Sequence, residues 1–214
     1  MKPIAAAVCV ASLLLSGCYL PDKYKADVTI QPDGAFQIAF DGEASMVLYV
    51  AEARHMSAEK RAREEANAAN EAKRMVGKDG ITAAEYLGDG RFKLSIHQEG
   101  TLAKTVDQNM FRIYKLPLDF ATLQRDDAGR IVITNVQPKE KDIQQLKALG
   151  LSSKGDICVK TKAPVIEHNA DSTPGVFSSC YAWKGFDLLS GGQFRIVLDI
   201  PAPPKTEQRT GQAW

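Results

Sequence analysis

Histidine is the side chain most often used for acid–base chemistry near neutral pH, and the chain carries three of them: His55, His97 and His168. None stands in a sequence motif of a known catalytic or nucleotide site, such as GxSxG, HExxH, GxGxxG or a P-loop. His97 falls on the polar side of an alternating segment, which favours contact with solvent. We therefore expect a chain without catalytic residues, without a metal site and without a cofactor.

Neighbouring carboxylates can share a proton in acid–base catalysis, and Asp126 and Asp127 are adjacent. They stand, however, in an Asp-Asp-Ala-Gly sequence that is typical of a turn. Asp33, Asp79 and Asp89 also lie beside glycines. No stretch offers the alternating oxygen ligands of a calcium loop. The carboxylates are therefore expected to shape turns rather than to form a reactive site.

Two cysteines in the second half of the chain, Cys158 and Cys180, could form a covalent crosslink. Their spacing does not fit a CxxC redox centre, and no histidine pair accompanies them for zinc. In an exported chain such a pair indicates a disulfide. Closing a loop of about two dozen residues would stabilise the fold by roughly 3 kcal/mol. Two buried free thiols, in a host without an oxidising envelope, are the alternative.

The first eighteen residues have the layout of a secretory signal. Lys2 supplies a positive charge, residues 4–15 are almost entirely apolar, and small residues lead into a cysteine in Leu15-Ser16-Gly17-Cys18. This apolar run is too short to span a bilayer. The last four residues resemble the lipobox of bacterial lipoproteins. The resemblance implies cleavage after Gly17, a diacylglyceryl thioether on Cys18 and acylation of the new amine.

Acyl chains on Cys18 would fix the protein to a membrane of the cell envelope, because two or three chains anchor a protein durably. Tyr19, not an aspartate, follows the cysteine. By the sorting rule of lipoproteins, this implies the outer membrane in a Gram-negative host. Removal of residues 1–17 takes away one basic residue and leaves basic and acidic residues equal in number. The charge balance therefore predicts no nucleic acid partner.

Alternation of apolar and polar residues predicts many short strands. They cover residues 26–30, 36–40, 82–87, 91–97, 110–116, 120–124, 130–136, 155–160, 164–169, 181–186 and 193–200. Segment 45–53 is more continuously apolar and fits either a strand or the start of a helix. Strands before, between and after two helices predict a single α+β domain with a mostly antiparallel sheet.

The clearest helix spans 57–76 and begins at Ser57, a favourable N-cap residue. Its apolar stripe is mostly alanine, which predicts a helix that lies close to a sheet while burying little area; a lid or a partner-docking helix is the alternative. Charged residues at i,i+4 spacing, including Arg61 and Glu65, predict ion pairs along it. A second helix covers 138–149. Both helices are expected to pack on the sheet.

These assignments divide the chain into four parts. Residues 1–17 form the signal peptide, 18–25 a tether, 26–200 the globular domain and 201–214 a proline-rich tail that is expected to be disordered.

Several segments together resemble the LppM-type domain of bacterial lipoproteins. They are the lipobox, Ala26-Asp27-Val28-Thr29-Ile30 with the Asp33-Gly34 turn, the polar helix after the third apolar segment, and Pro164-Val165-Ile166-Glu167-His168-Asn169 followed by the Pro174-Gly175 turn and Tyr181-Ala182-Trp183. The resemblance covers residues 18–200 and implies an α/β domain with an apolar cavity that binds envelope lipids or lipoglycans. It supplies no catalytic residues. The chain departs from the family in its added cysteine pair and in lacking a second apolar run long enough for the transmembrane helix with which members often end.

Two classes of function fit these observations. The first is a non-catalytic binding module whose apolar side chains line a pocket for a lipid or another envelope amphiphile. The candidate lining residues are Phe36, Phe40, Leu94, Ile96, Ile113, Trp183 and Phe186, and the same residues would equally form a solid core. The second is a structural or assembly lipoprotein that docks on another envelope protein. We favour the binding module; a hydrolase of the cell envelope is the third alternative.

Overall fold

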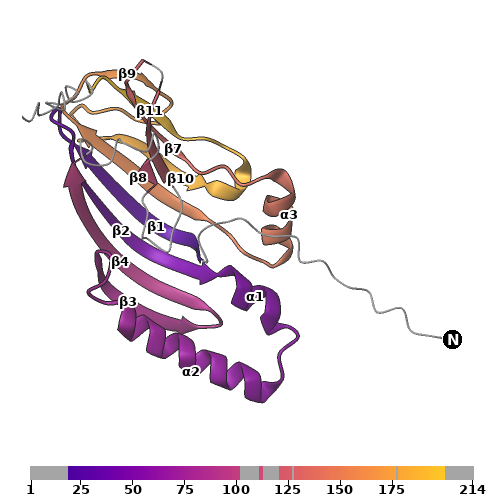
Figure 1. Cartoon of the computed structure of the whole chain (residues 1–214). Coiled ribbons are helices and arrows are strands. Elements are labelled where there is room, and N and C mark those ends of the chain that lie inside the picture. Colours follow the sequence, from indigo (N-terminus) through magenta and orange to yellow (C-terminus); the bar gives the residue numbers. More distant parts are fainter. Residues whose placement is uncertain (1–18, 102–110, 113–120, 127, 177, 201–214) are drawn as a thin grey trace, which may run out of the picture.

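The structure is a computed structural model that describes residues 19–101, 111–112, 121–126, 128–176 and 178–200 (Figure 1). The predicted signal peptide 1–17, the lipidation residue Cys18, the candidate pocket residue Ile113 and the predicted tail 201–214 lie outside these residues. Those four expectations therefore stay predictions. The described part contains two β-sheets and three α-helices.

Sheet A has six strands in the order β10-β8-β1-β2-β4-β3. They are β1 (Tyr19–Ile30), β2 (Ala35–Met46), β3 (Ile81–Gly88), β4 (Arg91–Thr101), β8 (Lys154–Thr161) and β10 (Tyr181–Asp187). Neighbouring strands pair antiparallel, except for the parallel pair β1 and β8.

Sheet B has five strands in the order β5-β6-β7-β11-β9, and all neighbours are antiparallel. They are β5 (Phe111–Arg112), β6 (Ala121–Arg125), β7 (Ile131–Asn135), β9 (Val165–His168) and β11 (Arg195–Leu198). The predicted α+β class with mostly antiparallel strands is confirmed. The sequence did not predict that the strands divide between two sheets. Strands that pair lie far apart in the sequence, and local patterns do not reveal which of them are partners.

The first strand of sheet A begins earlier in the chain than the sequence pattern predicts. The sequence predicts a tether over 18–25, whereas β1 already begins at Tyr19. Tyr19 lies opposite Met46 of β2, and the register shifts between Asp22 and Lys25. Such a bulge breaks the apolar–polar alternation locally, so the sequence gives no strand signal there.

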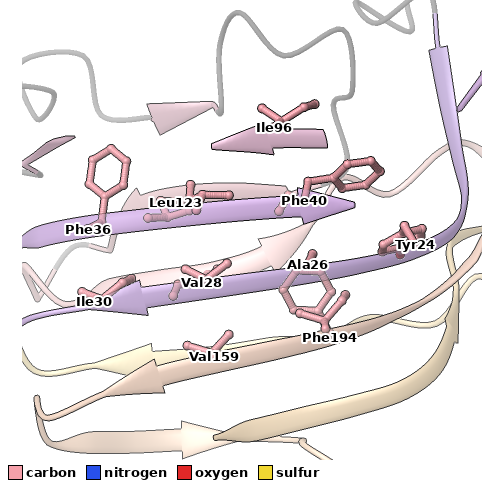
Figure 2. Close-up of a cluster of buried hydrophobic side chains, with 14 of the residues drawn as sticks. Tyr24, Ala26, Val28, Ile30, Phe36, Phe40, Ile96, Leu123, Val159 and Phe194 are labelled. Atoms are coloured by element: carbon pink, nitrogen blue, oxygen red, sulfur yellow. The ribbon is translucent and has the colours of Figure 1, made fainter. Parts of the chain in front are cut away.

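Sheet A has one apolar and one polar face, as its alternation requires. On β2, Phe36 and Phe40 are buried, whereas Gln37 and Asp41 are exposed. The apolar side, called the inner face below, shares one hydrophobic core with side chains of sheet B, including Leu123. Figure 2 shows Phe36 and Phe40 rising from the same side of their strand within this core. The other face of the sheet carries polar and charged side chains.

Three helices accompany the sheets. The undecided segment 45–53 contains the end of β2 and helix α1 (Val47–Ala53). The two predicted helices are present as α2 (Ala58–Met75) and α3 (Glu140–Ala148). The Ser57 hydroxyl accepts a hydrogen bond from the Lys60 N–H at 3.2 Å, which confirms the predicted N-cap of α2. Helices α1 and α3 share a small apolar cluster of Leu20, Val47, Ile143, Leu146 and Leu189.

Helix α2 lies along β3 (Figure 1) and is attached through small side chains and one carboxylate. Its buried residues are Ala68, Ala72 and Met75. The sequence placed the apolar stripe on Ala58, Ala62, Ala66, Ala69, Ala72 and Val76, but of these only Ala72 is buried and Ala69 half-buried, so the face that meets the sheet was predicted wrongly. A helix with so narrow an apolar stripe buries little area against the sheet. Polar contacts must therefore contribute more to its position than they would for a helix with large apolar residues.

The polar attachment of α2 centres on Glu65. Its carboxylate accepts hydrogen bonds from the Tyr49 hydroxyl of α1 and, at 3.2 Å, from the Asp89 N–H in the β3–β4 turn. Arg61 forms an ion pair with Asp89 at 3.4 Å. The sequence predicts an ion pair between Arg61 and Glu65. In the structure, each of the two side chains instead contacts partners outside the helix. Neighbouring elements place those partners within reach, and helical spacing alone cannot show this.

The predicted disulfide is confirmed. Cys158 of β8 is bonded to Cys180, which directly precedes β10, and their Cα atoms are 5.6 Å apart. Because β8 and β10 are neighbours in sheet A, the bond secures the loop between β9 and β10 to the sheet.

Candidate binding site

Four of the residues predicted to line an apolar pocket lie on the inner face of sheet A. Phe36 and Phe40 come from β2, and Leu94 and Ile96 from β4. None is more than 6% exposed, and all four belong to the main hydrophobic core. For Phe40, Leu94 and Ile96 this position is that of ordinary core side chains.

Trp183 and Phe186 of β10 gather around Phe194 at the other side of the core. Both rings have their centroids 5.5 Å from that of Phe194. The Trp183 indole N–H donates a hydrogen bond to the Asn169 side-chain oxygen at 2.9 Å. The Trp183 ring is thus packed and its polar atom is satisfied, which is the usual arrangement of a buried tryptophan. Trp183 also lines a cavity of about 620 Å³ beside the disulfide, whereas Phe186 lines none of the described cavities.

Phe36 is the predicted residue that reaches a pocket at the end of sheet A. The pocket has a volume of about 410 Å³. Its walls come from the end of β1, the start of β2 and the end of β4. The lining residues are Thr29, Gln31, Ala35, Phe36, Gln37, Glu99, Gly100 and Thr101.

Strand register explains how these residues meet. Thr29 pairs with Gln37, and Gln37 pairs with Glu99, so the three side chains form one row on the polar face of the sheet. Phe36 pairs with Gly100 in the adjacent row, which belongs to the inner face. The pocket therefore joins a polar row to the edge of the apolar core.

Gly100 makes room for the aromatic wall of the pocket. A Cβ atom at this position would lie 2.9 Å from the Phe36 ring, which is closer than side chains normally approach. Any other residue here would push the ring aside. The pairing of Phe36 with Gly100 joins two distant strands, so the sequence pattern showed the phenylalanine but not the glycine that accommodates it.

The lining combines two kinds of chemistry. Ala35 and the small exposed part of Phe36 present apolar carbon surface, whereas two glutamine amides, two threonine hydroxyls and the Glu99 carboxylate offer hydrogen-bond donors and acceptors. Such a mixture suits a ligand with an apolar portion and a polar, hydrogen-bonding portion.

The histidines occupy separate places on the surface. His55 follows α1, His97 lies on the polar face of β4, and His168 of β9 accepts a hydrogen bond from the Ala170 N–H at 3.2 Å. In the part of the chain that the structure describes, no three His, Cys, Asp or Glu side chains are grouped as metal ligands would be.

Asp126 of the adjacent carboxylate pair belongs to the turn between β6 and β7. Its side chain accepts hydrogen bonds from the N–H groups of Ala128 and Arg130, at 3.0 and 2.9 Å. An ion pair with the Arg130 guanidinium at 2.7 Å lowers the pKa of Asp126. The predicted role in a turn is confirmed for Asp126, while Asp127 lies outside the described residues.

Comparison with known proteins assigns the chain to no family. No family model matches it, and no curated protein matches it. Among solved structures, the NMR structure of the folded domain of LppM from Mycobacterium tuberculosis aligns with a TM-score of 0.43 and 12% sequence identity, over 91% of this chain and 98% of that one. A similarity of this level establishes neither a family nor a function. Within the described residues, no helix has both the length and the apolar character needed to cross a membrane.

Proposed function

We propose that this chain is a lipid-anchored protein of the bacterial envelope that binds a lipid or another amphiphile without catalysing a reaction. The pocket at Phe36 is the observation on which the binding role rests. The lipobox-like Leu15-Ser16-Gly17-Cys18 supports the anchor, with palmitate or similar acyl chains attached to Cys18. Sorting to the outer membrane in a Gram-negative host is part of the same proposal.

The pocket has the size and chemistry of a site for part of an amphiphile. Its volume of about 410 Å³ lies within the range of small-molecule sites, about 300 to 1,000 Å³. An alkyl segment would contact Phe36 and Ala35, and a polar head group would reach the row of Thr29, Gln37 and Glu99. Transfer of each methylene from water to the apolar wall would contribute about 0.8 kcal/mol.

The pocket also lies far from the proposed anchor along β1. Tyr19, the residue after Cys18, begins the strand, and Thr29 of the pocket lies near its end. Ten residues of extended strand span roughly 33 Å. Sheet A would therefore hold the pocket well away from the anchored end of the chain.

A test of binding uses the chain from residue 18 onward with Cys18→Ser, so that no acyl anchor is present. Native mass spectrometry after purification from a bacterial envelope extract should show a bound lipid-sized mass. Ala35→Phe would fill the pocket and abolish that mass. Ala39→Phe is the matched control, because Ala39 lies four residues along the same strand, is also half-buried and does not line the pocket.

Both variants should melt within a few degrees of each other, which separates loss of binding from loss of folding. A protein that is recovered bare, or a bound mass that survives Ala35→Phe, would contradict the proposed site. Anchoring is tested separately with labelled palmitate in the full chain. The label should appear on the intact protein and disappear with Cys18→Ser.

A further inference from the structure

A second cavity lies where helix α2 faces the start of β1. It has a volume of about 270 Å³ and is called the α2 groove below. Its lining residues are Tyr19, Met46, Glu64, Asn67, Ala68, Asn70, Glu71, Arg74 and Phe92. The sheet side of the groove consists of two aromatic rings and a methionine, and is mostly apolar, whereas the helix side contributes mostly polar groups.

The apolar wall is built by three strands of sheet A. Tyr19 of β1 lies opposite Met46 of β2, and its ring meets that of Phe92 of β4 edge to face, with centroids 5.3 Å apart. Phe92 is fully buried, and Tyr19 and Met46 are partly exposed. Apolar surface at the mouth of the groove is therefore accessible, while its deep end belongs to the main core.

The small side chain of Ala68 on α2 explains why the groove is open. Residues three, four and seven positions apart share one side of a helix, so Glu64, Ala68 and Glu71 point the same way. Where α2 meets sheet A, Ala68 supplies one methyl group instead of a long apolar side chain. The flanking carboxylates prefer water and do not fill the space. The apolar side chains that sheet A presents to the groove are therefore not covered by large apolar side chains of α2.

We propose that the α2 groove holds part of an acyl chain carried by Cys18, an inference that rests on the proposed lipidation of that residue. Covalent geometry provides the main reason. Consecutive Cα atoms are about 3.8 Å apart, so a lipid on Cys18 starts one residue from Tyr19, which itself forms part of the groove. No other described cavity has a lining residue adjacent to Cys18.

The environment of the protein decides when the groove is occupied. In water, each buried methylene contributes about 0.8 kcal/mol, so a chain gains by leaving the solvent for the groove. In a bilayer the lipid tails are as apolar as the groove, and this gain disappears. The groove would thus shelter part of one chain while the protein is in water and release it at the membrane.

The chain itself permits a direct test. From residue 18 onward its cysteines are Cys18, Cys158 and Cys180, and the last two are joined in the disulfide. The Cys18 thiol of unlipidated protein can therefore be alkylated selectively with N-ethylmaleimide or with N-hexadecylmaleimide. The methyl resonances of Met46 and Ala68 then report on the groove by NMR.

The hexadecyl adduct should shift both methyl resonances and show cross-relaxation between them and the alkyl protons, whereas the ethyl adduct should do neither. Asn67→Trp, which places a large ring in the groove, should remove the shifts. Lys73→Trp, an exposed residue of α2 outside the groove, should retain them. Equal spectra for the two adducts would overturn the proposal.

Association between molecules is the main competing cause of such shifts. Isotope-labelled protein without an alkyl chain is mixed with unlabelled hexadecyl adduct, and its resonances should not move. Shifts in that mixture would show contact between copies and would also overturn the proposal. Because the chain is attached chemically, failure here is distinguishable from failure of lipidation in the cell, which palmitate labelling tests.

Discussion

Replacing Glu65 by glutamine tests how α2 is held on the sheet. The Glu65 carboxylate accepts hydrogen bonds from the Tyr49 hydroxyl and from the Asp89 N–H at 3.2 Å, and the Tyr86 hydroxyl also donates to it. These donors belong to α1 and to the β3–β4 hairpin. Glutamine has nearly the same shape, but it carries no charge and replaces one acceptor oxygen with a donor.

The expected loss follows from the hydrogen bonds involved. A hydrogen bond to a charged group contributes about 1.5 to 3 kcal/mol, and one between neutral groups about 0.5 to 1.5 kcal/mol. Since the site is partly exposed, we expect Glu65→Gln to lower the free energy of unfolding by about 1 to 2 kcal/mol. Glu65→Ala should cost more, about 2 to 4 kcal/mol, because it leaves the Tyr49 hydroxyl, on a residue only 4% exposed, without its acceptor.

The effect should depend on pH in a defined direction. Partial burial opposes ionisation, but the hydrogen bonds from Tyr49, Tyr86 and Asp89 outweigh it and lower the pKa of Glu65. A carboxyl whose pKa is lowered by folding stabilises the fold above its unfolded value, about 4.3, and loses this contribution as the pH falls through the folded value. The difference between the wild type and Glu65→Gln should therefore be full at pH 7 and decline below about pH 4.

Urea denaturation of both proteins at pH 7 and in acid measures this difference. Glu71→Gln is the control, because Glu71 lies on the same helix and pairs only at 3.7 Å with exposed Arg74. That change should stay within about 0.5 kcal/mol of the wild type. Equal stability of Glu65→Gln and the wild type at pH 7, or a difference that does not shrink in acid, would refute the role assigned to Glu65.

Two further changes test the covalent and steric constraints on sheet A. Replacing Cys158 and Cys180 together by alanine should lower stability by roughly 3 kcal/mol in the chain-entropy model, and chemical denaturation of both proteins measures the loss. Gly42→Ala should cost about 1 to 3 kcal/mol, because the new Cβ would lie 2.5 Å from the Tyr24 Cβ. Gly175→Ala, where the new Cβ would have no described atom within 4 Å beyond its own residue and chain neighbours, should leave the melting temperature unchanged.

Elements whose pattern is local could be predicted from the sequence. The alternation around Phe36, Phe40, Leu94 and Ile96 predicted strands with these residues on one face, and all four are on the inner face of sheet A. The helix after Ser57 was also predicted, because its N-cap and the charges of its first and last turns are local features, but the residues that it buries were not, apart from Ala72. Short-range physics determines such features, so a single sequence displays them.

Features that depend on distant pairing were missed. Gly42 faces Tyr24, and Gly100 faces Phe36, so each glycine matters only because of a residue on another strand. In the sequence, Glu65 is one of many charged residues of α2. Its hydrogen bond from the Asp89 N–H depends on the β3–β4 turn, which lies far away in the sequence. The division of the strands into two sheets was missed for the same reason, because it also depends on pairing between distant strands. Of the residues that line the candidate pocket, the sequence predicted only Phe36, and it did not predict where the pocket lies.

The two proposed sites lie at opposite ends of one strand, and this has a consequence for their coupling. Tyr19 of the α2 groove and Thr29 of the pocket both belong to β1, which is paired with β2 on one side and β8 on the other. A strand paired on both sides cannot slide without breaking hydrogen bonds along its length. Occupation of one site should thus leave the other unchanged. The methyl shifts that the hexadecyl adduct causes in the α2 groove should persist in Ala35→Phe. Loss of these shifts in that variant would show that sheet A transmits a structural change from the pocket to the groove despite the pairing of β1 on both sides.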